Sequence, residues 1–466
     1  MHEPGDHTGP LTAELAEFAS GLRFDSIPPA TIEHAKLSIL DAIGCALFGA
    51  TLPWIEKLRD VVLSEGGHPQ ATLWGSATRV SSAQAALVNA TAVHAFEFDD
   101  VHMGGMIHPG ALALGAGLAA GEPRALDGAQ LLTAFVAGCE VGARVGRSVG
   151  IQHFRVGHHP QGTVGVFAAA AAAGRALGLE PAQLHDALGL AGSQASGLMA
   201  AQEGSMAKRL HSGLACQAGV RSARLAEVGF TGIRDVFEAE FGGFLSTMGG
   251  GNVHEGALTS GLGTTWETDQ IGFKPFASCA AAQSSIAAAR ELRAALAAGG
   301  VIPEAVLVRT STHTQLHCGW AYRPTGVTAA QMSIPYGVAC MLLYGDASVA
   351  RFTDEAIRDA ATVRLAREVT VLGDEGIDAL GPDHRYVVHV EARTAEGRTF
   401  ACDVADRPGG PTQPMTRDEV TAKFDSLVAP ILGAQRTSGL RRCVDGLEGL
   451  DDARKLARDM ARDAPP

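Results

Sequence analysis

Three histidines and three acidic residues lie within fifteen positions of a largely apolar part of the chain. They belong to His94-Ala95-Phe96-Glu97-Phe98-Asp99-Asp100-Val101-His102 and the His108-Pro109 that follows, and we call residues 94–108 the acid loop. Charged groups packed this densely in a hydrophobic sequence are costly unless they are paired or used. Three interpretations fit: a polar loop with helix-capping acids, a zinc or iron site, or acid–base catalysis by a histidine tuned by a neighbouring carboxylate.

Two segments further along the chain are candidates for holding an anion. The first, His158-His159-Pro160-Gln161-Gly162-Thr163, is either a turn capped by its threonine or an imidazole at a helix N-terminus, where free N–H groups favour an anion. The second, residues 204–213, carries Lys208 and Arg209 just before an amphipathic stretch. It is either a solvated basic turn or a carboxylate clamp.

A fourth candidate is Lys274-Pro275-Phe276-Ala277-Ser278-Cys279. It lies where the sequence changes from a purely helical pattern to a mixed helix and strand pattern, which marks a predicted domain junction. Clefts at domain boundaries are favoured sites for small molecules, so this junction is a plausible wall of a binding site. Cys279 has no histidine beside it in the sequence, and the pattern therefore does not favour a nucleophilic cysteine.

Helices are the elements that must position these residues. Apolar residues recur near the helical period over most of the first 260 residues, and Gly or Pro separates the segments. The predicted helices are two within 11–50, then 82–94, 110–120, 127–146, 162–177, 181–197 and 213–228. The helix at 82–94 leads directly into the acid loop, which is the usual placement of catalytic groups on rigid scaffolds.

A mixed pattern marks residues 271–405. It predicts helices at 280–298 and 329–343, strands at 305–310 and 369–372, and a hairpin of 386–393 with 399–404. After Pro408-Gly409-Gly410-Pro411 the pattern is helical again, at 416–432 and 451–461. We therefore predict a mainly α protein with a large all-helical domain (1–270 and 406–466) and a smaller α+β lid domain (271–405).

The composition limits the function classes. The 466 residues are 46% hydrophobic and carry a net charge of −13, which supports a large core and argues against nucleic-acid binding. The eight cysteines contain no CxxC pair, which favours free thiols in a reducing compartment. The first residues lack the pattern of a signal peptide, and no apolar run is long enough to span a bilayer. We expect a soluble cytoplasmic protein that does not contact a membrane.

Read jointly, these segments resemble the MmgE/PrpD family, which contains 2-methylcitrate dehydratase, cis-aconitate decarboxylase and iminodisuccinate epimerase. The resemblance covers nearly the full length, and each landmark is short, but eight of them in order are specific. They are residues 35–44, Asn89 with 94–100, His108-Pro109, 162–165, 208–213, 229–232, 274–276 and Lys423-Phe424.

The resemblance implies a helical domain with an α+β lid, an active site between them, a homodimer, and no required metal or organic cofactor. Family members act on small di- or tricarboxylates by moving a proton at a carbon next to a carboxylate. Lys208 would then hold a substrate carboxylate and stabilise the developing enolate-like charge. The predicted catalytic residues are Asp100, His108, His159 and Lys208. The predicted substrate-binding residues are Glu97, Asp99, His102, Arg209, Lys274 and Gln283.

Two departures from the family pattern bear on the substrate. Glu97 and Val101 stand where members that use tricarboxylates have Asp and Thr, and residues 278–283 lack the usual Arg and His. Losing a charge-assisted bond of ~1.5–3 kcal/mol disfavours 2-methylcitrate and cis-aconitate, and favours a substrate with fewer carboxylates or with an amide or ring. Arg323 and the His313/His317 pair are candidates for compensating polarity, although nothing in the sequence places them in the cleft.

The sequence favours a cofactor-independent lyase that dehydrates a small hydroxy-carboxylate by abstracting a proton next to a carboxylate. A decarboxylase needs much the same groups, but holds the leaving carboxylate away from Lys208 in an apolar pocket. An epimerase needs two acid–base groups on opposite faces of one carbon, and Gln283 in place of a basic residue weakens that scheme. The non-enzyme alternative is a ligand-binding protein on an inactive scaffold, against which the four predicted catalytic residues argue together.

Overall fold

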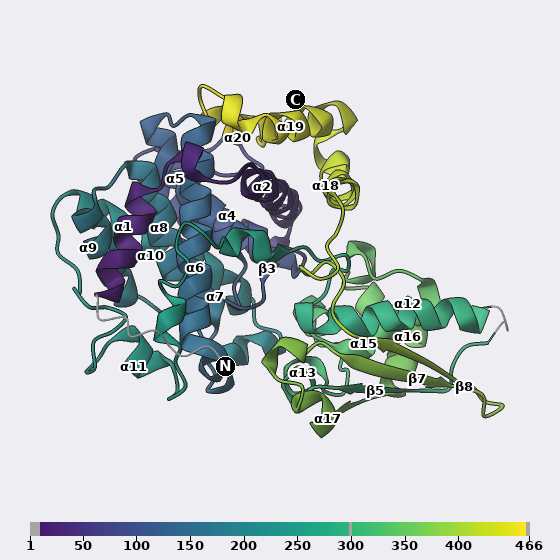
Figure 1. Ribbon diagram of the computed structural model, residues 1–466. Coiled ribbons are helices and arrows are strands. Elements are labelled where there is room, and N and C mark those ends of the chain that lie inside the picture. Colours follow the sequence, from purple (N-terminus) through teal and green to yellow (C-terminus); the bar gives the residue numbers. More distant parts are fainter. Residues whose placement is uncertain (1–9, 298–300, 463–466) are drawn as a thin grey trace.

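The computed structural model of the chain describes residues 10–297 and 301–462, and they are mostly helical with a small region of sheet (Figure 1). The mainly α class is therefore confirmed. The first nine residues, on which the signal-peptide expectation depends, and Ala298, at the end of a predicted helix, lie outside the described residues. Among the described residues, no single helix has the length and apolarity to cross a bilayer.

The helices before residue 260 pack around a central pair, α6 and α8 (Figure 1). Their bounds are α1 Leu11–Gly21, α2 Pro29–Gly49, α3 Pro53–Glu65, α4 Ser82–Val93, α5 Gly115–Gly121, α6 Gly128–Arg155, α7 Pro160–Thr163, α8 Gly165–Leu177, α9 Pro181–Gly192, α10 Ala207–Glu227 and α11 Phe244–Met248. A Cβ at Gly142 would lie 2.6 Å from the Cβ of Ala168, so small residues are what allow α6 and α8 to approach.

A four-stranded sheet forms the other part of the molecule. Its strands are β5 Ala305–Thr310, β6 Val369–Gly373, β7 Val388–Arg393 and β8 Thr399–Val404, in the order β6-β5-β7-β8. β5 pairs parallel with β6 and antiparallel with β7, and β7 and β8 form the predicted hairpin. The helices of this part are α12 Gln283–Ala297, α13 Thr312–Cys318, α14 Val327–Gln331, α15 Ile334–Tyr344, α16 Ala360–Arg367 and α17 Glu375–Asp378. α12 packs on β7 and β8, and α15 packs on β6 and α12 (Figure 1).

Several predicted helices differ from the structure at their ends. α10 begins at Ala207 and not at 213, so Lys208 and Arg209 lie in its first turn, α9 ends at Gly192 and not at 197, and α6 continues beyond 146 to Arg155.

Two further helix predictions differ in kind. The expected helix 110–120 is present, but its first turn, Gly110–Leu114, is π-helical. The expected helix 329–343 is divided into α14 and α15, because Ser333 is extended and its hydroxyl accepts a hydrogen bond from the Tyr336 N–H at the new helix start.

Short strands that the sequence does not predict tie the acid loop to the segment before Lys274. β3 (Val101–His102) pairs antiparallel with β4 (Ile271–Gly272), and β1 (Ala71–Thr72) pairs with β2 (Arg79–Val80). The β3–β4 pair holds two chemistry-bearing segments together although they are some 170 positions apart in the chain.

The C-terminal helices lie over the helical part. α18 (Arg417–Leu432) packs against α2, and is followed by α19 (Ala434–Asp445) and α20 (Arg454–Asp459) (Figure 1). Lys423 on α18 forms an ion pair with the buried carboxylate of Asp41 on α2 at 2.7 Å, and donates a hydrogen bond to the carbonyl of Phe98. The division into domains at residues 270 and 405 stays a prediction.

Candidate active site

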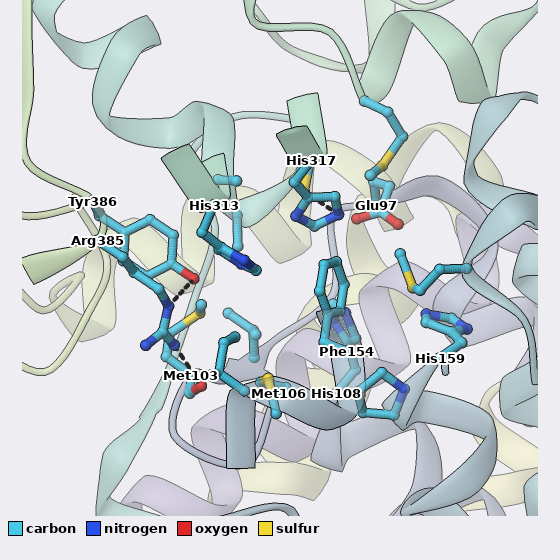
Figure 2. A pocket seen from close by; sticks show the side chains of 18 of the residues that line it. Glu97, Met103, Met106, His108, Phe154, His159, His313, His317, Arg385 and Tyr386 are labelled. Atoms are coloured by element: carbon cyan, nitrogen blue, oxygen red, sulfur yellow. Dashed lines mark hydrogen bonds between the residues drawn. The ribbon is translucent and has the colours of Figure 1, made fainter. Parts of the chain in front are cut away.

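A cavity lies between the helical part and the sheet-containing part, and the predicted segments meet around it (Figure 2). Its polar lining residues are Glu97, His108, His159, Lys208, Cys279, His313, His317, Arg385 and Tyr386. Its apolar lining residues include Val101, Met103, Met106, Ile151, Phe154, Met199 and Met332. The acid loop, the start of α7, the start of α10 and helix α13 all contribute to the wall.

Glu97 is the centre of a buried cluster of cations. It forms an ion pair with Lys208, lies 2.6 Å from Arg209 Nη1, and lies 3.3 Å from Lys274 Nζ. Burial opposes ionisation of Glu97, but Lys208, Lys274 and Arg209 hold its pKa well below its usual range. Lys208 lines the cavity, whereas Arg209 and Lys274 contact Glu97 without lining it. A substrate carboxylate in the cavity would therefore meet the Lys208 ammonium.

Asp99 connects two histidines of the acid loop. Its Oδ2 lies 2.8 Å from His94 Nδ1, and its Oδ1 lies 3.3 Å from His108 Nδ1. Burial opposes its ionisation, yet His108 and His94 hold the pKa of Asp99 well below its usual range. Burial lowers the pKa of His94 to about 3, so His94 is neutral near pH 7 and packs beside the His108 ring at 4.5 Å between centroids.

His108 presents one ring nitrogen to the cavity. Its Nδ1 lies 2.7 Å from the carbonyl oxygen of Asp100, which only accepts, so Nδ1 carries the proton and donates. That bond leaves Nε2 to exchange a proton with a ligand. The His108 N–H also donates to the Gln161 side chain at 2.8 Å, which holds the backbone of this residue against α7.

Asp100 lies outside the cavity lining, and its carboxylate supports the backbone. It accepts hydrogen bonds from the Ser38 hydroxyl and from the Gly110 N–H at 3.0 Å, at the start of the π-helical turn. Burial, with Asp41 nearby, raises the pKa of Asp100 well above its usual range. Its carbonyl contacts His108, so the structure gives this residue a positioning contact, and its predicted catalytic role stays untested.

Asp100→Ala is expected to lower the free energy of unfolding by about 1–3 kcal/mol, because the buried Gly110 N–H and Ser38 hydroxyl lose their acceptor. Urea unfolding of the variant and the wild type measures the change, with the exposed Asp60→Ala on α3 as the control. A loss no greater than that of the control would mean that these hydrogen bonds do not support the fold.

His159 meets a second histidine at the cavity wall. Its Nδ1 lies 2.8 Å from Nδ1 of His211 on α10, and one of the two nitrogens donates to the other. Burial, with Lys208 nearby, lowers the pKa of His159 well below its usual range, so the ring is neutral at pH 7. It is placed to accept or relay a proton beside Lys208.

Of the six predicted substrate-binding residues, only Glu97 lines this cavity. Three others contact its lining residues from behind, and the remaining two, His102 and Gln283, make other contacts. His102 Nε2 is 3.1 Å from Glu267 Oε2, and its Nδ1 accepts from the Gly105 N–H at 2.8 Å. Gln283 is fully buried, and its amide donates to the carbonyls of Phe276 and Ser278, which holds the backbone after Lys274 in shape. Both side chains are occupied by contacts within the protein, and neither lines the cavity.

The Glu267 side chain makes stability depend on pH. Burial opposes its ionisation, but the hydrogen bond from His102 and the charges of His102 and Arg147 lower its pKa from 4.5 to about 2. A carboxyl group whose pKa is lower in the folded than in the unfolded state stabilises the fold at pH values above its unfolded-state pKa. This stabilisation is lost as pH falls through the folded-state pKa.

Glu267→Gln is therefore expected to lower the free energy of unfolding by about 3 kcal/mol at neutral pH. The difference from the wild type should shrink as pH falls from about 4.5 to 2. Urea unfolding over that pH range measures it, with the exposed Glu14→Gln on α1 as a matched change. A difference that is constant with pH would exclude this linkage.

Helix α13 places two histidines at the cavity, and the sequence alone does not show where they lie. His313 and His317 are four positions apart on one face of α13, and both line the cavity against Phe154 (Figure 2). Burial lowers the pKa of His313 to about 3, so it is neutral. Arg323 instead lines a separate surface hollow with Glu203 and Trp320. His317 Nε2 lies 3.9 Å from Cys279 Sγ, so the histidine missing beside Cys279 in sequence is present in space.

Arg385 and Tyr386 close the end of the cavity opposite Glu97 (Figure 2). The Arg385 guanidinium donates to the Tyr386 hydroxyl at 2.9 Å and to the Met103 carbonyl at 2.8 Å. These contacts connect the sheet-containing part to the acid loop. No motif in the sequence marks these two residues, because their place depends on how the two parts pack.

Comparisons with known proteins identify the family of this chain. The MmgE/PrpD N-terminal domain matches residues 13–256, and the MmgE/PrpD C-terminal domain matches residues 276–447. Cis-aconitate decarboxylase of Aspergillus terreus is 31% identical over 96% of this chain and 95% of its own length. Cis-aconitate decarboxylase of Homo sapiens is 27% identical over 98% of this chain and 95% of its own length. The expected family is confirmed: this chain is an enzyme of the MmgE/PrpD family.

Proposed function

We propose that this protein decarboxylates a small unsaturated di- or tricarboxylate. The observation that carries the proposal is the mixed lining of the cavity, which combines the Lys208 ammonium with apolar side chains. We call these apolar side chains, which include Phe154 and four methionines, the apolar wall. The similar Aspergillus and human proteins, which are cis-aconitate decarboxylases, support this choice over dehydration.

The mixed lining of the cavity suits two carboxylates of one substrate. Lys208 donates to the carboxylate that stays, and stabilises the negative charge that develops next to it. The carboxylate that leaves lies against the apolar wall, where it is poorly solvated, and losing its charge as CO2 is favoured there. The apolar wall is formed from the acid loop, α6 and the segments around Met199 and Met332.

The reaction needs one proton. The bond between the leaving carboxylate and its carbon breaks, and the electron pair moves into the neighbouring double bond, which shifts by one position. The imidazolium form of His108 donates its Nε2 proton to the far carbon of that double bond, and CO2 leaves. One proton is consumed for each CO2 released, and the histidine regains its proton from solvent.

Dehydration, which the sequence favours, uses the same groups and remains the second candidate. The observation in its favour is that Asp99 and the Asp100 carbonyl orient His108, as a base that abstracts a proton next to a carboxylate requires. The expectation against cis-aconitate also stays open, because His313, His317 and Arg385 add polarity to the cavity that the 278–283 segment lacks.

Turnover in deuterated water distinguishes these reactions. The protein is incubated with cis-aconitate and with di- and tricarboxylates that have either a double bond or a β-hydroxyl group, and NMR follows the products. We expect release of CO2 and one deuterium per product molecule. Loss of water without CO2 would replace decarboxylation by dehydration, and exchange at one carbon without net product would indicate an epimerase. No reaction with any compound would contradict the proposal.

A further inference from the structure

The fold brings two cysteines and a histidine together at the cavity wall. Cys279 follows the Lys274-Pro275-Phe276 segment, whereas His317 and Cys318 are the last two residues of α13. The Sγ atoms and one ring nitrogen all lie within 4.8 Å of one another. We call these three residues the thiol cluster. None of the reaction steps proposed above uses it.

We propose that the thiol cluster binds a thiophilic divalent cation of the Zn2+ class, with one coordination position open to the active-site cavity. Thiolate and imidazole are the ligands that such ions prefer, whereas Mg2+ and Ca2+ prefer oxygen. This proposal can be tested independently of the proposed decarboxylation, because metal binding is measured without turnover.

The spacing of Cys279 and His317 is close to that of two ligands in a tetrahedral site. Metal bonds of about 2.3 Å to sulfur and 2.0–2.1 Å to nitrogen place the two donor atoms about 3.6 Å apart. Cys279 Sγ and His317 Nε2 are 3.9 Å apart, so movements of a few tenths of an ångström complete the bonds. The His317 ring packs against Phe154 in an edge-to-face arrangement, with 4.9 Å between centroids.

The burial of the thiol cluster determines that the fourth coordination position of the ion faces the cavity. Cys318 is fully buried behind the wall, whereas Cys279 and His317 line the cavity. A fourth ligand therefore approaches from the cavity side. Three protein ligands and one open position are the arrangement of catalytic-type zinc sites, in contrast to closed structural sites.

The charges also balance. Both thiols release their protons to solvent on binding, and two thiolates with a neutral imidazole and a divalent ion form a neutral unit, as burial requires. Lys208 lines the same cavity, but its charge is paired with Glu97. The other candidate group, His94, Asp99 and His108, is less suited, because its atoms already bond one another and Lys274 Nζ lies 3.5 Å from Asp99.

Cobalt binding tests the proposal directly. The full-length protein is reduced, freed of metal with a chelator, and titrated with Co2+ without oxygen. We expect one equivalent to bind, with a thiolate-to-cobalt charge-transfer band and the visible bands of tetrahedral Co2+, and Zn2+ to displace it while Mg2+ does not. Absence of the charge-transfer band in the reduced wild-type protein would overturn the proposal.

Variants then assign the ligands. C279S and C318S should each weaken Co2+ binding by at least about 100-fold, and H317Q should weaken it measurably while the charge-transfer band remains. C402S is the matched control, because Cys402 lies on β8 outside the cluster, and it should bind as the wild type does. Circular dichroism confirms that each variant is folded. An unchanged band in the C279S/C318S double variant would place the ion elsewhere and overturn the assignment.

Discussion

Lys208→Ala is expected to lower kcat/KM by about 10²–10³-fold, which is the typical loss when one preorganised donor is removed from a developing negative charge. Lys208 is the member of the cation cluster around Glu97 that lines the cavity, so Arg209 and Lys274 cannot replace it without moving Glu97. The remaining two cations still neutralise Glu97, and the variant should therefore fold.

The measurement is steady-state kinetics with the compound that turns over fastest in the deuterium experiment. Lys455→Ala on α20 serves as the control, because Lys455 also pairs with a carboxylate, that of Asp459, but at the surface. We expect kcat to fall as well as KM to rise, since Lys208 contacts the charge that grows during the reaction. A loss below tenfold would remove Lys208 from the chemical step.

Asp99→Asn is expected to lower kcat by about 10²-fold and to leave KM nearly unchanged. Asp99 is fully buried and does not line the cavity, so its effect must pass through His108 and His94. The amide keeps the shape of the carboxylate but removes its charge. It also turns an NH2 group toward one of the two rings, which disturbs the orientation of His108.

Kinetics of the variant test this positioning role, with Asp269→Asn as the matched change at an exposed carboxylate that accepts from Thr31. Asp99→Glu should recover part of kcat, because it restores the charge. If KM rises while kcat is kept, Asp99 acts in substrate binding, and the assignment of His108 as the proton donor loses its support.

The sequence predicts which residues meet at the site better than it predicts the role of each residue. Lys208, His108, His159 and Glu97 meet at one cavity, as the landmark motifs imply. Within the acid loop, the direction of each side chain depends on how the loop packs in the folded protein, and the order of residues in the motif does not reveal it. Asp100 and His102 are near neighbours of Asp99, yet their side chains bind Ser38 and Glu267.

The residues that the sequence does not place come from contacts between distant segments. Arg385, Tyr386 and the α13 histidines reach the cavity only because the sheet-containing part packs against the acid loop. Their local patterns are those of an ordinary hairpin and a short helix. The β3–β4 pair, with two residues on each strand, is likewise too short for a periodic signal.

The backbone of Glu97 has a consequence for how a ligand binds. Glu97 is one of three non-glycine residues with a positive φ among the described residues, at 53°, and its carboxylate forms an ion pair with Lys208. In the proposed reaction, a substrate carboxylate therefore approaches an ammonium that already holds a carboxylate of the protein. The new ion pair forms at a charge that is already partly neutralised, so the measured affinity of a substrate is lower than an ion pair with a free ammonium would give.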